Sequence, residues 1–126
     1  MCADDHTFRY SGARRMSILS LETFHGEGSV RIALEGELDY SSALILDDEL
    51  RRAEAGIHPV LVLDLSELRF MDSTGLGIIA SAYRRMRRAG RRLIVASPTK
   101  GVKRILELTG MLQRLEVVED LAVVPA

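Results

Sequence analysis

The sequence lacks several features that would assign it to a class at once. Its single cysteine, Cys2, excludes an intramolecular disulfide and a cysteine-rich metal site. The 17 Lys+Arg and 18 Asp+Glu residues nearly cancel to a net charge of −1, so the chain as a whole has no field that would attract nucleic acid or an anionic membrane. We therefore expect no metal, no cofactor and no direct nucleic-acid partner.

Long hydrophobic runs are also missing. No apolar stretch approaches the roughly 18–20 residues that span a bilayer, and residues 1–25 contain no apolar region typical of a signal peptide. The sequence thus predicts a cytoplasmic protein without a membrane partner. Residues 1–15 are polar and without a sustained period, as in a mobile N-terminal extension, and 126 residues at 47% hydrophobic suit one domain, placed at 16–126.

Catalytic motifs are absent as well. The residues around Ser73 do not form the GxSxG turn of a serine hydrolase, and no phosphate-binding GxxxxGK[ST] loop occurs. The histidines, His6, His25 and His58, lie in the extension, in a Gly-rich turn and beside a proline, so none is placed as a general base for Ser73. We expect no enzymatic activity.

What is present is an orderly change of hydrophobic period along the chain. Alternating and continuous apolar runs predict strands, and apolar residues spaced by three and four predict amphipathic helices. The pattern indicates an α/β fold with a mixed four- to five-stranded sheet packed with amphipathic helices. The expected strands are 16–23, 30–35, 60–63 and 93–96, with 115–118 as a last strand or cover, and the expected helices are 41–55, 75–90 and 102–108.

The stretch FMDSTGLG, from Phe70 to Gly77, lies between the apolar strand at 60–63 and the following helix. The first N–H groups of a helix have no partners within it, and Asp72, Ser73 or Thr74 could cap them, with glycines allowing close packing. A second interpretation is a phosphate site, because a helix N-terminus favours an anion and Ser73 offers a hydroxyl there. The residues alone leave both interpretations open.

A basic run is the other unusual feature. Residues 83–92 contain six arginines, which in a helix could touch nucleic acid or anionic lipid. Tyr83 and Met86, however, continue the apolar stripe, and arginines between such positions are typical of a solvated face. Contact with an acidic region of a partner would use the same arginines.

Three blocks of the sequence resemble one known family. VLVLDLSELRFMDSTGLGII resembles the signature of the STAS domain, in particular that of the bacterial anti-sigma factor antagonists. LEGELDYSSALILDDEL, at 34–50, and SPTKGVKRILELTGM, at 97–111, are similar to two further segments of that family. The similarity covers residues 16 to 120, and the order and spacing of the blocks make it specific.

The resemblance implies a STAS fold and a function. It predicts an anti-sigma factor antagonist whose unphosphorylated form binds an anti-sigma factor with serine kinase activity and so releases a sigma factor. Phosphorylation of Ser73, in preference to Thr74, would switch binding off, and a serine phosphatase would restore it. The residues implied at the partner surface are Asp39, Phe70, Met71, Asp72, Ser73, Thr74 and Gly75.

Two alternatives stay open beside this prediction. Asp39 also fits the turn chemistry of a strand end, where an Asp side chain bonds nearby backbone N–H groups. For the whole chain, the alternative function is a stand-alone STAS subunit that senses a ligand or acts as a scaffold in a transporter or a lipid-trafficking complex.

Overall fold

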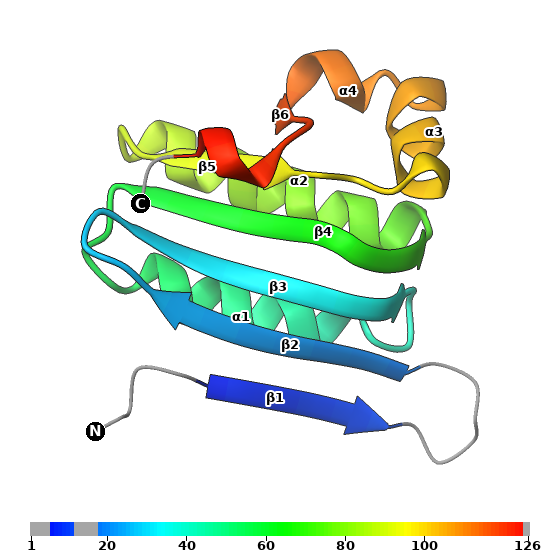
Figure 1. Cartoon of the computed structure of the whole chain (residues 1–126), viewed down its shortest axis with the longest axis horizontal. Coiled ribbons are helices and arrows are strands. Elements are labelled where there is room, and N and C mark those ends of the chain that lie inside the picture. The colour runs from blue at the N-terminus through cyan, green and yellow to red at the C-terminus, as the bar shows by residue number, and fades with distance from the viewer. Residues whose placement is uncertain (1–5, 12–17, 125–126) are drawn as a thin grey trace.

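The computed structural model describes residues 6–11 and 18–124, which form a six-stranded sheet in the order β1-β2-β3-β4-β5-β6 (Figure 1). The antiparallel part consists of β1 (His6–Ser11), β2 (Ile18–His25) and β3 (Ser29–Leu38). The parallel part continues from β3 through β4 (Val60–Met71), β5 (Arg92–Ala96) and β6 (Glu116–Val118). The predicted mixed sheet is confirmed, with β1 as an additional edge strand.

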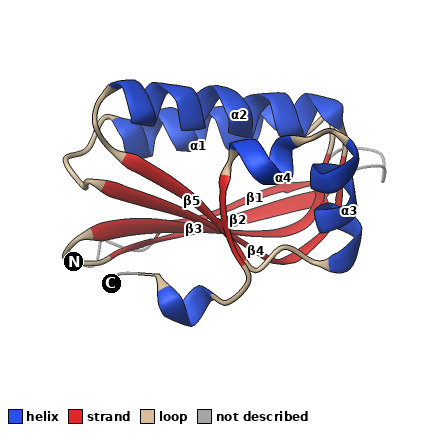
Figure 2. Ribbon diagram, turned by 90° about the horizontal axis from the view of Figure 1, so that it is seen from above, coloured by secondary structure: helices blue, strands red, loops and turns tan. Residues whose placement is uncertain are grey.

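The helices lie mainly on one face of this sheet. The amphipathic helices α1 (Ala43–Glu54) and α2 (Ser73–Arg88) run side by side along it (Figure 2). Two shorter helices, α3 (Lys100–Leu108) and α4 (Met111–Arg114), follow β5, and the 3-10 turn η1 (Leu121–Val123) lies against the opposite face. Because α1 and α2 each follow a parallel strand, both helices begin at the carboxyl edge of the sheet.

Strand β4 is buried on both faces, as its continuous apolar run predicts. Leu61 and Leu63 point into the main core under the helices. Val60 and Val62 form a smaller cluster with Ile94 on the other face, where partly buried hydrophobic residues of the C-terminal segment cover them. The buried centre of the sheet therefore supports the loops and helix ends at its edges.

Two features of the sheet differ from the sequence-based prediction. Strand β4 does not end at Leu63 but continues to Met71, paired with β3 up to Leu38 opposite Met71. Beyond Leu63 the alternation of apolar and polar residues is irregular, because register shifts interrupt the pairing of β4 with β3. The two-residue period of a strand is therefore hard to recognise in this part of the sequence. Within the predicted extension, residues 6–11 form β1, while 1–5 and 12–15 lie outside the described residues, so the division at residue 15 stays a prediction.

Candidate functional site

The site predicted from the sequence forms where β3 and β4 end. The backbone N–H of Asp72 donates to the carbonyl of Leu38 at 3.1 Å. Because β3 and β4 are parallel, this bond brings the loop that enters α1 next to the turn that enters α2. The GELDY and FMDST segments, which are 30 residues apart in the chain, therefore share one edge of the molecule.

Asp72 fastens these two segments with one carboxylate. Its Oδ1 accepts from the backbone N–H of Gly75 at 3.0 Å and caps α2. Its Oδ2 accepts from the backbone N–H of Tyr40 at 3.1 Å, in the loop between β3 and α1. Of the three capping residues that the sequence left open, Asp72 is the one that caps the helix, and it also fixes the neighbouring loop.

Ser73 and Thr74 are the first two residues of α2, and both are exposed. With the Asp72 carboxylate bound to Gly75, the N–H groups of Ser73 and Thr74 have no hydrogen bond to any described residue. The Ser73 hydroxyl thus lies at the positively polarised end of a sixteen-residue helix, open to solvent. This position meets the geometric requirement for accepting a phosphate.

Two predicted partner residues lie beneath this surface instead. Met71 is 1% exposed and belongs to the main core. Gly75 is buried where α2 approaches β3, and a Cβ built on it would meet Leu38 Cγ at 2.5 Å and the Leu38 carbonyl oxygen at 3.3 Å. These two buried residues hold the site in position, and their contact with a partner stays a prediction.

Asp39 shows the turn chemistry that the sequence allowed. Its Oδ1 accepts from the backbone N–H of Ser41 at 3.0 Å and from the Ser41 hydroxyl at 2.7 Å, which closes the loop before α1. The residue is half-buried and directly precedes Tyr40, so it lies at the same edge as Ser73. Contact of Asp39 with a partner remains a prediction.

Large hydrophobic side chains are exposed at the same edge of the sheet as the serine. Phe70, predicted from the sequence, is 47% exposed, and Tyr40 and Leu44 are 77% and 70% exposed. Tyr40 and Leu44 were not predicted from the sequence, although Leu44 is apolar and out of phase with the buried stripe of α1, which is a signal present in the sequence. We refer to Tyr40, Leu44, Phe70, Ser73 and Thr74 together as the Ser73 surface.

The described part of the chain offers few other candidates. None of its helices is long and apolar enough to cross a membrane. Within residues 6–11 and 18–124, no group of three or more His, Cys, Asp and Glu side chains is placed to hold a metal ion. The Ser73 surface is thus the place where exposed hydrophobic area, a helix terminus and a modifiable hydroxyl coincide.

Comparisons with known proteins converge on one family. The sequence profile of the STAS domain matches residues 21–123. An anti-sigma F factor antagonist from Paenibacillus polymyxa is 28% identical over 81% of this chain and 88% of its own length. An anti-sigma-B factor antagonist from Listeria monocytogenes is 30% identical over 70% of this chain and 77% of its own.

The fold gives the same result. The crystal structure of an anti-sigma factor antagonist from Mycobacterium paratuberculosis superposes with a TM-score of 0.77 at 25% identity, and covers 82% of this chain and 88% of that one. Because the matches span most of the chain in both sequence and structure, they include the strand, the turn and the helix that build the Ser73 surface.

Proposed function

Because this chain belongs to the STAS domain family, we propose that it is itself an anti-sigma factor antagonist, switched by phosphorylation of Ser73. The unphosphorylated Ser73 surface binds an anti-sigma factor with serine kinase activity, and the sigma factor held by that partner is released. The kinase then phosphorylates Ser73, and a serine phosphatase reverses the step. The protein acts in the cytoplasm as a regulator and catalyses no reaction.

The observation that carries this proposal is the position of Ser73. Its hydroxyl is exposed at the start of α2, so a kinase can reach it without unfolding any part of the domain. The exposed Tyr40, Leu44 and Phe70 supply apolar and aromatic area of the kind that fills the centre of protein interfaces.

The same geometry lets the domain tolerate the phosphate. A phosphoserine adds about −1.5 to −2 charge, and a helix N-terminus stabilises a negative charge by typically about 0.3–1 kcal/mol. The open N–H groups of Ser73 and Thr74 are directly available to the new phosphate oxygens. We therefore expect the phosphorylated domain to keep its fold.

The bound complex, in contrast, does not tolerate it. Closing an apolar surface over a doubly charged group removes its water, and burial of an unpaired charge is strongly unfavourable. A partner carboxylate about 6 Å away at an effective dielectric near 20 adds roughly 3 kcal/mol per charge before salt screening. Since each 1.4 kcal/mol is about tenfold in affinity, the modification weakens binding by about a hundredfold or more.

The test is phosphorylation in a defined mixture. Each anti-sigma factor kinase encoded in the source genome is purified and incubated with the full chain and Mg-ATP, and the intact mass is followed. We expect one of these kinases to add a single phosphate to the wild type and to Thr74→Ala, and none to Ser73→Ala. Calorimetry with the same kinase should give wild-type affinity for Ser73→Ala and weak binding for Ser73→Asp.

Two results would contradict the proposal. One is a Ser73→Ala variant that still gains one phosphate from the kinase at the normal rate. The other is that none of the purified kinases binds the unmodified chain, which would favour a scaffold role instead. The Thr74→Ala variant is the matched control, because it removes the neighbouring hydroxyl from the same exposed helical turn.

A further inference from the structure

The arginine-rich run at the other end of α2 has no role in the switch, and the structure divides it into two groups. Arg85 makes two hydrogen bonds to the Glu54 carboxylate, at 2.7 and 2.8 Å, and this contact raises the pKa of its guanidinium. Arg91 donates to the backbone carbonyls of residues 54, 56 and 58. Arg92 pairs with Glu116. The guanidinium groups of these three arginines are therefore bonded to other parts of the domain.

The other three arginines, Arg84, Arg87 and Arg88, are exposed and pair with no carboxylate of the described residues. The Arg84 guanidinium reaches only the Ser81 hydroxyl, at 3.3 Å, and that of Arg87 only the Tyr83 hydroxyl, at 3.4 Å. Their interaction with the helix C-terminus is favourable but leaves most N–H donors unused. Three fixed cations therefore face solvent at this end.

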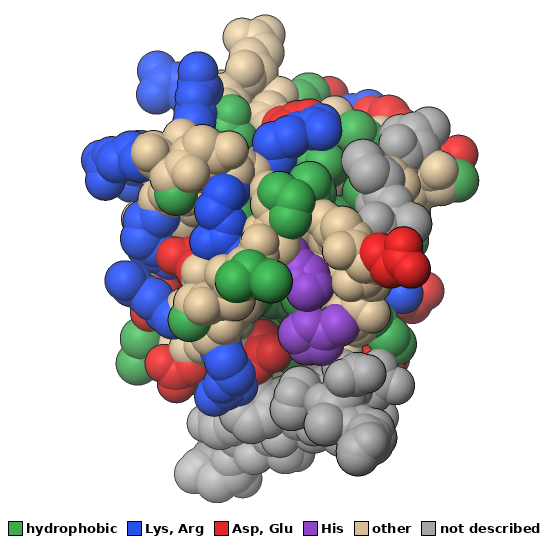
Figure 3. Space-filling view, turned by 90° about the vertical axis from the view of Figure 1, so that its left-hand side faces the viewer, with side chains coloured by type: hydrophobic (Ala, Val, Ile, Leu, Met, Phe, Trp, Pro, Cys, Tyr) green, Lys and Arg blue, Asp and Glu red, His purple; other side chains and the backbone are tan. Residues whose placement is uncertain are grey.

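An apolar feature lies at the same end of the molecule. Ile57, in the loop between α1 and β4, is 93% exposed. It borders a hollow of about 260 Å³ whose lining includes Val30, Ala53, His25 and His58. Figure 3 views this end, with the histidines near the centre, hydrophobic side chains beside them and Lys and Arg side chains gathered along one side.

Hydrogen bonds fix the position of the Ile57 loop relative to the end of α2. Arg91 lies three residues after the end of α2, and its guanidinium donates to the carbonyls of Gly56 and His58 on either side of Ile57. Arg85 fastens α2 to the last residue of α1 in the same way. The loop that carries Ile57 is thus held at the same end of the molecule as Arg88, while Arg87 lines a separate hollow together with Tyr83 and Glu116.

We propose that this region, which we call the arginine end (Arg84, Arg87, Arg88, Ile57 and the adjoining hollow), binds an acidic segment of another protein. Carboxylates of that segment pair with the three guanidinium groups, and an apolar side chain enters the hollow beside Ile57. The planar N–H donors of each guanidinium match the two oxygens of a carboxylate. A short peptide segment that carries several carboxylates and one apolar side chain would contact both the arginines and the hollow. The proposal is independent of the Ser73 switch.

Other anionic partners fit this surface less well. A nucleic-acid backbone would use the cations but not the apolar hollow, and Tyr83, the aromatic residue within α2, is half-buried and not placed to stack on bases. A lipid surface needs a broad apolar face, whereas Ile57 is the exposed large hydrophobic residue that the described chain offers here. Acidic protein is the chemistry that uses both features at once.

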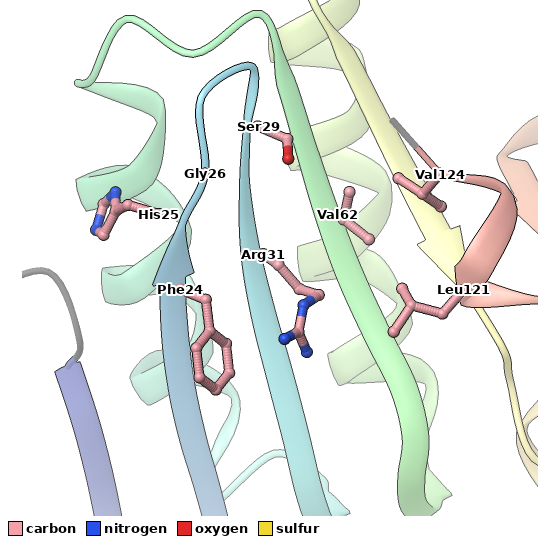
Figure 4. A pocket seen from close by; sticks show the side chains of 8 residues that line it. All are labelled: Phe24, His25, Gly26, Ser29, Arg31, Val62, Leu121 and Val124. Atoms are coloured by element: carbon pink, nitrogen blue, oxygen red, sulfur yellow. The ribbon is translucent and has the colours of Figure 1, made fainter. Parts of the chain in front are cut away.

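A hollow elsewhere on the molecule lacks this combination of features. It measures about 270 Å³ and lies on the face of the sheet opposite α1 and α2, between Phe24, Arg31 and the C-terminal residues Leu121 and Val124 (Figure 4). The Arg31 guanidinium there already pairs with Asp64 at 3.3 Å and lies 4.3 Å from the centre of the Phe24 ring. Because Asp64 neutralises the charge of Arg31, the hollow favours neither an anionic nor a cationic ligand. We therefore assign no class of ligand to it.

The test is an NMR titration of the ¹⁵N-labelled full chain. The probe is a synthetic peptide of alternating glutamate and leucine, and its controls replace every glutamate by glutamine or every leucine by alanine. We expect the amides of Ile57, His58 and residues 84–90 to shift with the acidic peptide, more weakly with the alanine control and not with the glutamine control. Affinity should fall severalfold between low and physiological salt, as charge pairing requires.

Variants locate the site and decide the proposal. Arg87→Glu/Arg88→Glu should lose about tenfold or more in peptide affinity, and Ile57→Ala should lose severalfold. The matched control is Lys100→Glu/Arg104→Glu on α3, which makes the same charge change at exposed positions away from the hollow and should keep wild-type affinity. Equal loss in both double variants would overturn the proposal.

Two further outcomes would also overturn it. They are preferential binding of a DNA duplex, or of vesicles of equal parts phosphatidylglycerol and phosphatidylcholine, over the acidic peptide. The Ser73→Ala variant should bind the peptide as the wild type does, so failure at the arginine end leaves the phosphorylation proposal untouched and the reverse also holds.

Discussion

The two ends of α2 are built in opposite ways. From Ser73 to Tyr83 the helix carries no charged side chain, whereas four of its last five residues, Arg84–Arg88, are arginines. The amino end presents small hydroxyl residues beside exposed hydrophobic side chains, and the carboxyl end presents fixed cations. One helix thus offers a neutral surface, to which the proposed phosphorylation would add charge, and a second surface whose charge is permanent.

Distance makes these two surfaces electrostatically separate. Ser73 and Arg84 are eleven residues apart, and at a rise of 1.5 Å per residue this is about 16 Å along the helix. The screening length at physiological salt is about 8 Å, so a phosphate on Ser73 has little influence on the arginines. Under the two proposals, the helix would bind two partners, and occupation of one site would have little effect on affinity at the other.

The largest effect that we expect concerns how the amino end is positioned. Gly75→Ala places a methyl group 2.5 Å from Leu38 Cγ. The Leu38 carbonyl oxygen, 3.3 Å from the same methyl position, belongs to the backbone and limits how far the contact can relax. Overpacking of this kind typically costs about 1–3 kcal/mol of unfolding free energy. Urea denaturation followed by circular dichroism measures the loss.

Gly77→Ala is the control for this prediction and should act in the opposite direction. Nothing lies within 4 Å of a Cβ at Gly77, which is exposed and one helical turn from Ser73. Alanine is favoured over glycine in a helix by about 0.8–1.0 kcal/mol, so this variant should be more stable. If both variants lost the same stability, α2 would not approach β3 as described.

The next effect is the loss of the carboxylate that holds the amino end. Asp72→Ala removes the cap on Gly75 and the bond to the Tyr40 N–H, and we expect a loss of about 1–2 kcal/mol. Asp72→Asn keeps an acceptor for one N–H group and should lose less. A loss in Asp72→Ala below about 0.5 kcal/mol in urea denaturation would mean that neither bond stabilises the fold.

At the same end of α2, a third substitution should lower affinity for the partner with little change in the free energy of unfolding. Leu44→Ala removes a side chain that is 70% exposed, so unfolding free energy should change by less than about 0.5 kcal/mol. Affinity for the anti-sigma factor kinase should fall by about fivefold or more, because truncation of an interface anchor typically costs over about 1 kcal/mol. Leu108→Ala, on α3 and equally exposed, is the matched control and should keep full affinity.

Much of the fold could be predicted because its signals are local. The uninterrupted apolar residues Val60–Leu63 indicate a strand buried on both faces, and the helical periods of α1 and α2 place their apolar faces on the sheet. The continuation of β4 to Met71 could not be read in this way, because irregular pairing with β3 breaks the alternation. Strand β1 was missed because a short edge strand needs no buried pattern of its own.

The site shows the same division between local and long-range information. The motif around Ser73 and its place at a helix start follow from neighbouring residues. The bond from Asp72 to the Tyr40 N–H and the packing of Gly75 on Leu38 join residues far apart in the chain, so only the folded structure reveals them. Of the six arginines at 83–92, the sequence gives no means to separate the three that bind within the fold from the three that do not.

The smallest expected effect is a test of independence between the two ends of α2. Ser73→Asp introduces one negative charge about 16 Å from Arg84, about two screening lengths away at physiological salt. The affinity of the glutamate and leucine peptide for the arginine end should then change by less than about twofold. Phosphorylated wild type, with about twice the added charge, should behave alike in the same NMR titration. A larger change that persists at high salt could not come from the charge itself, and would mean that α2 transmits the modification through a shift of the whole helix on the sheet.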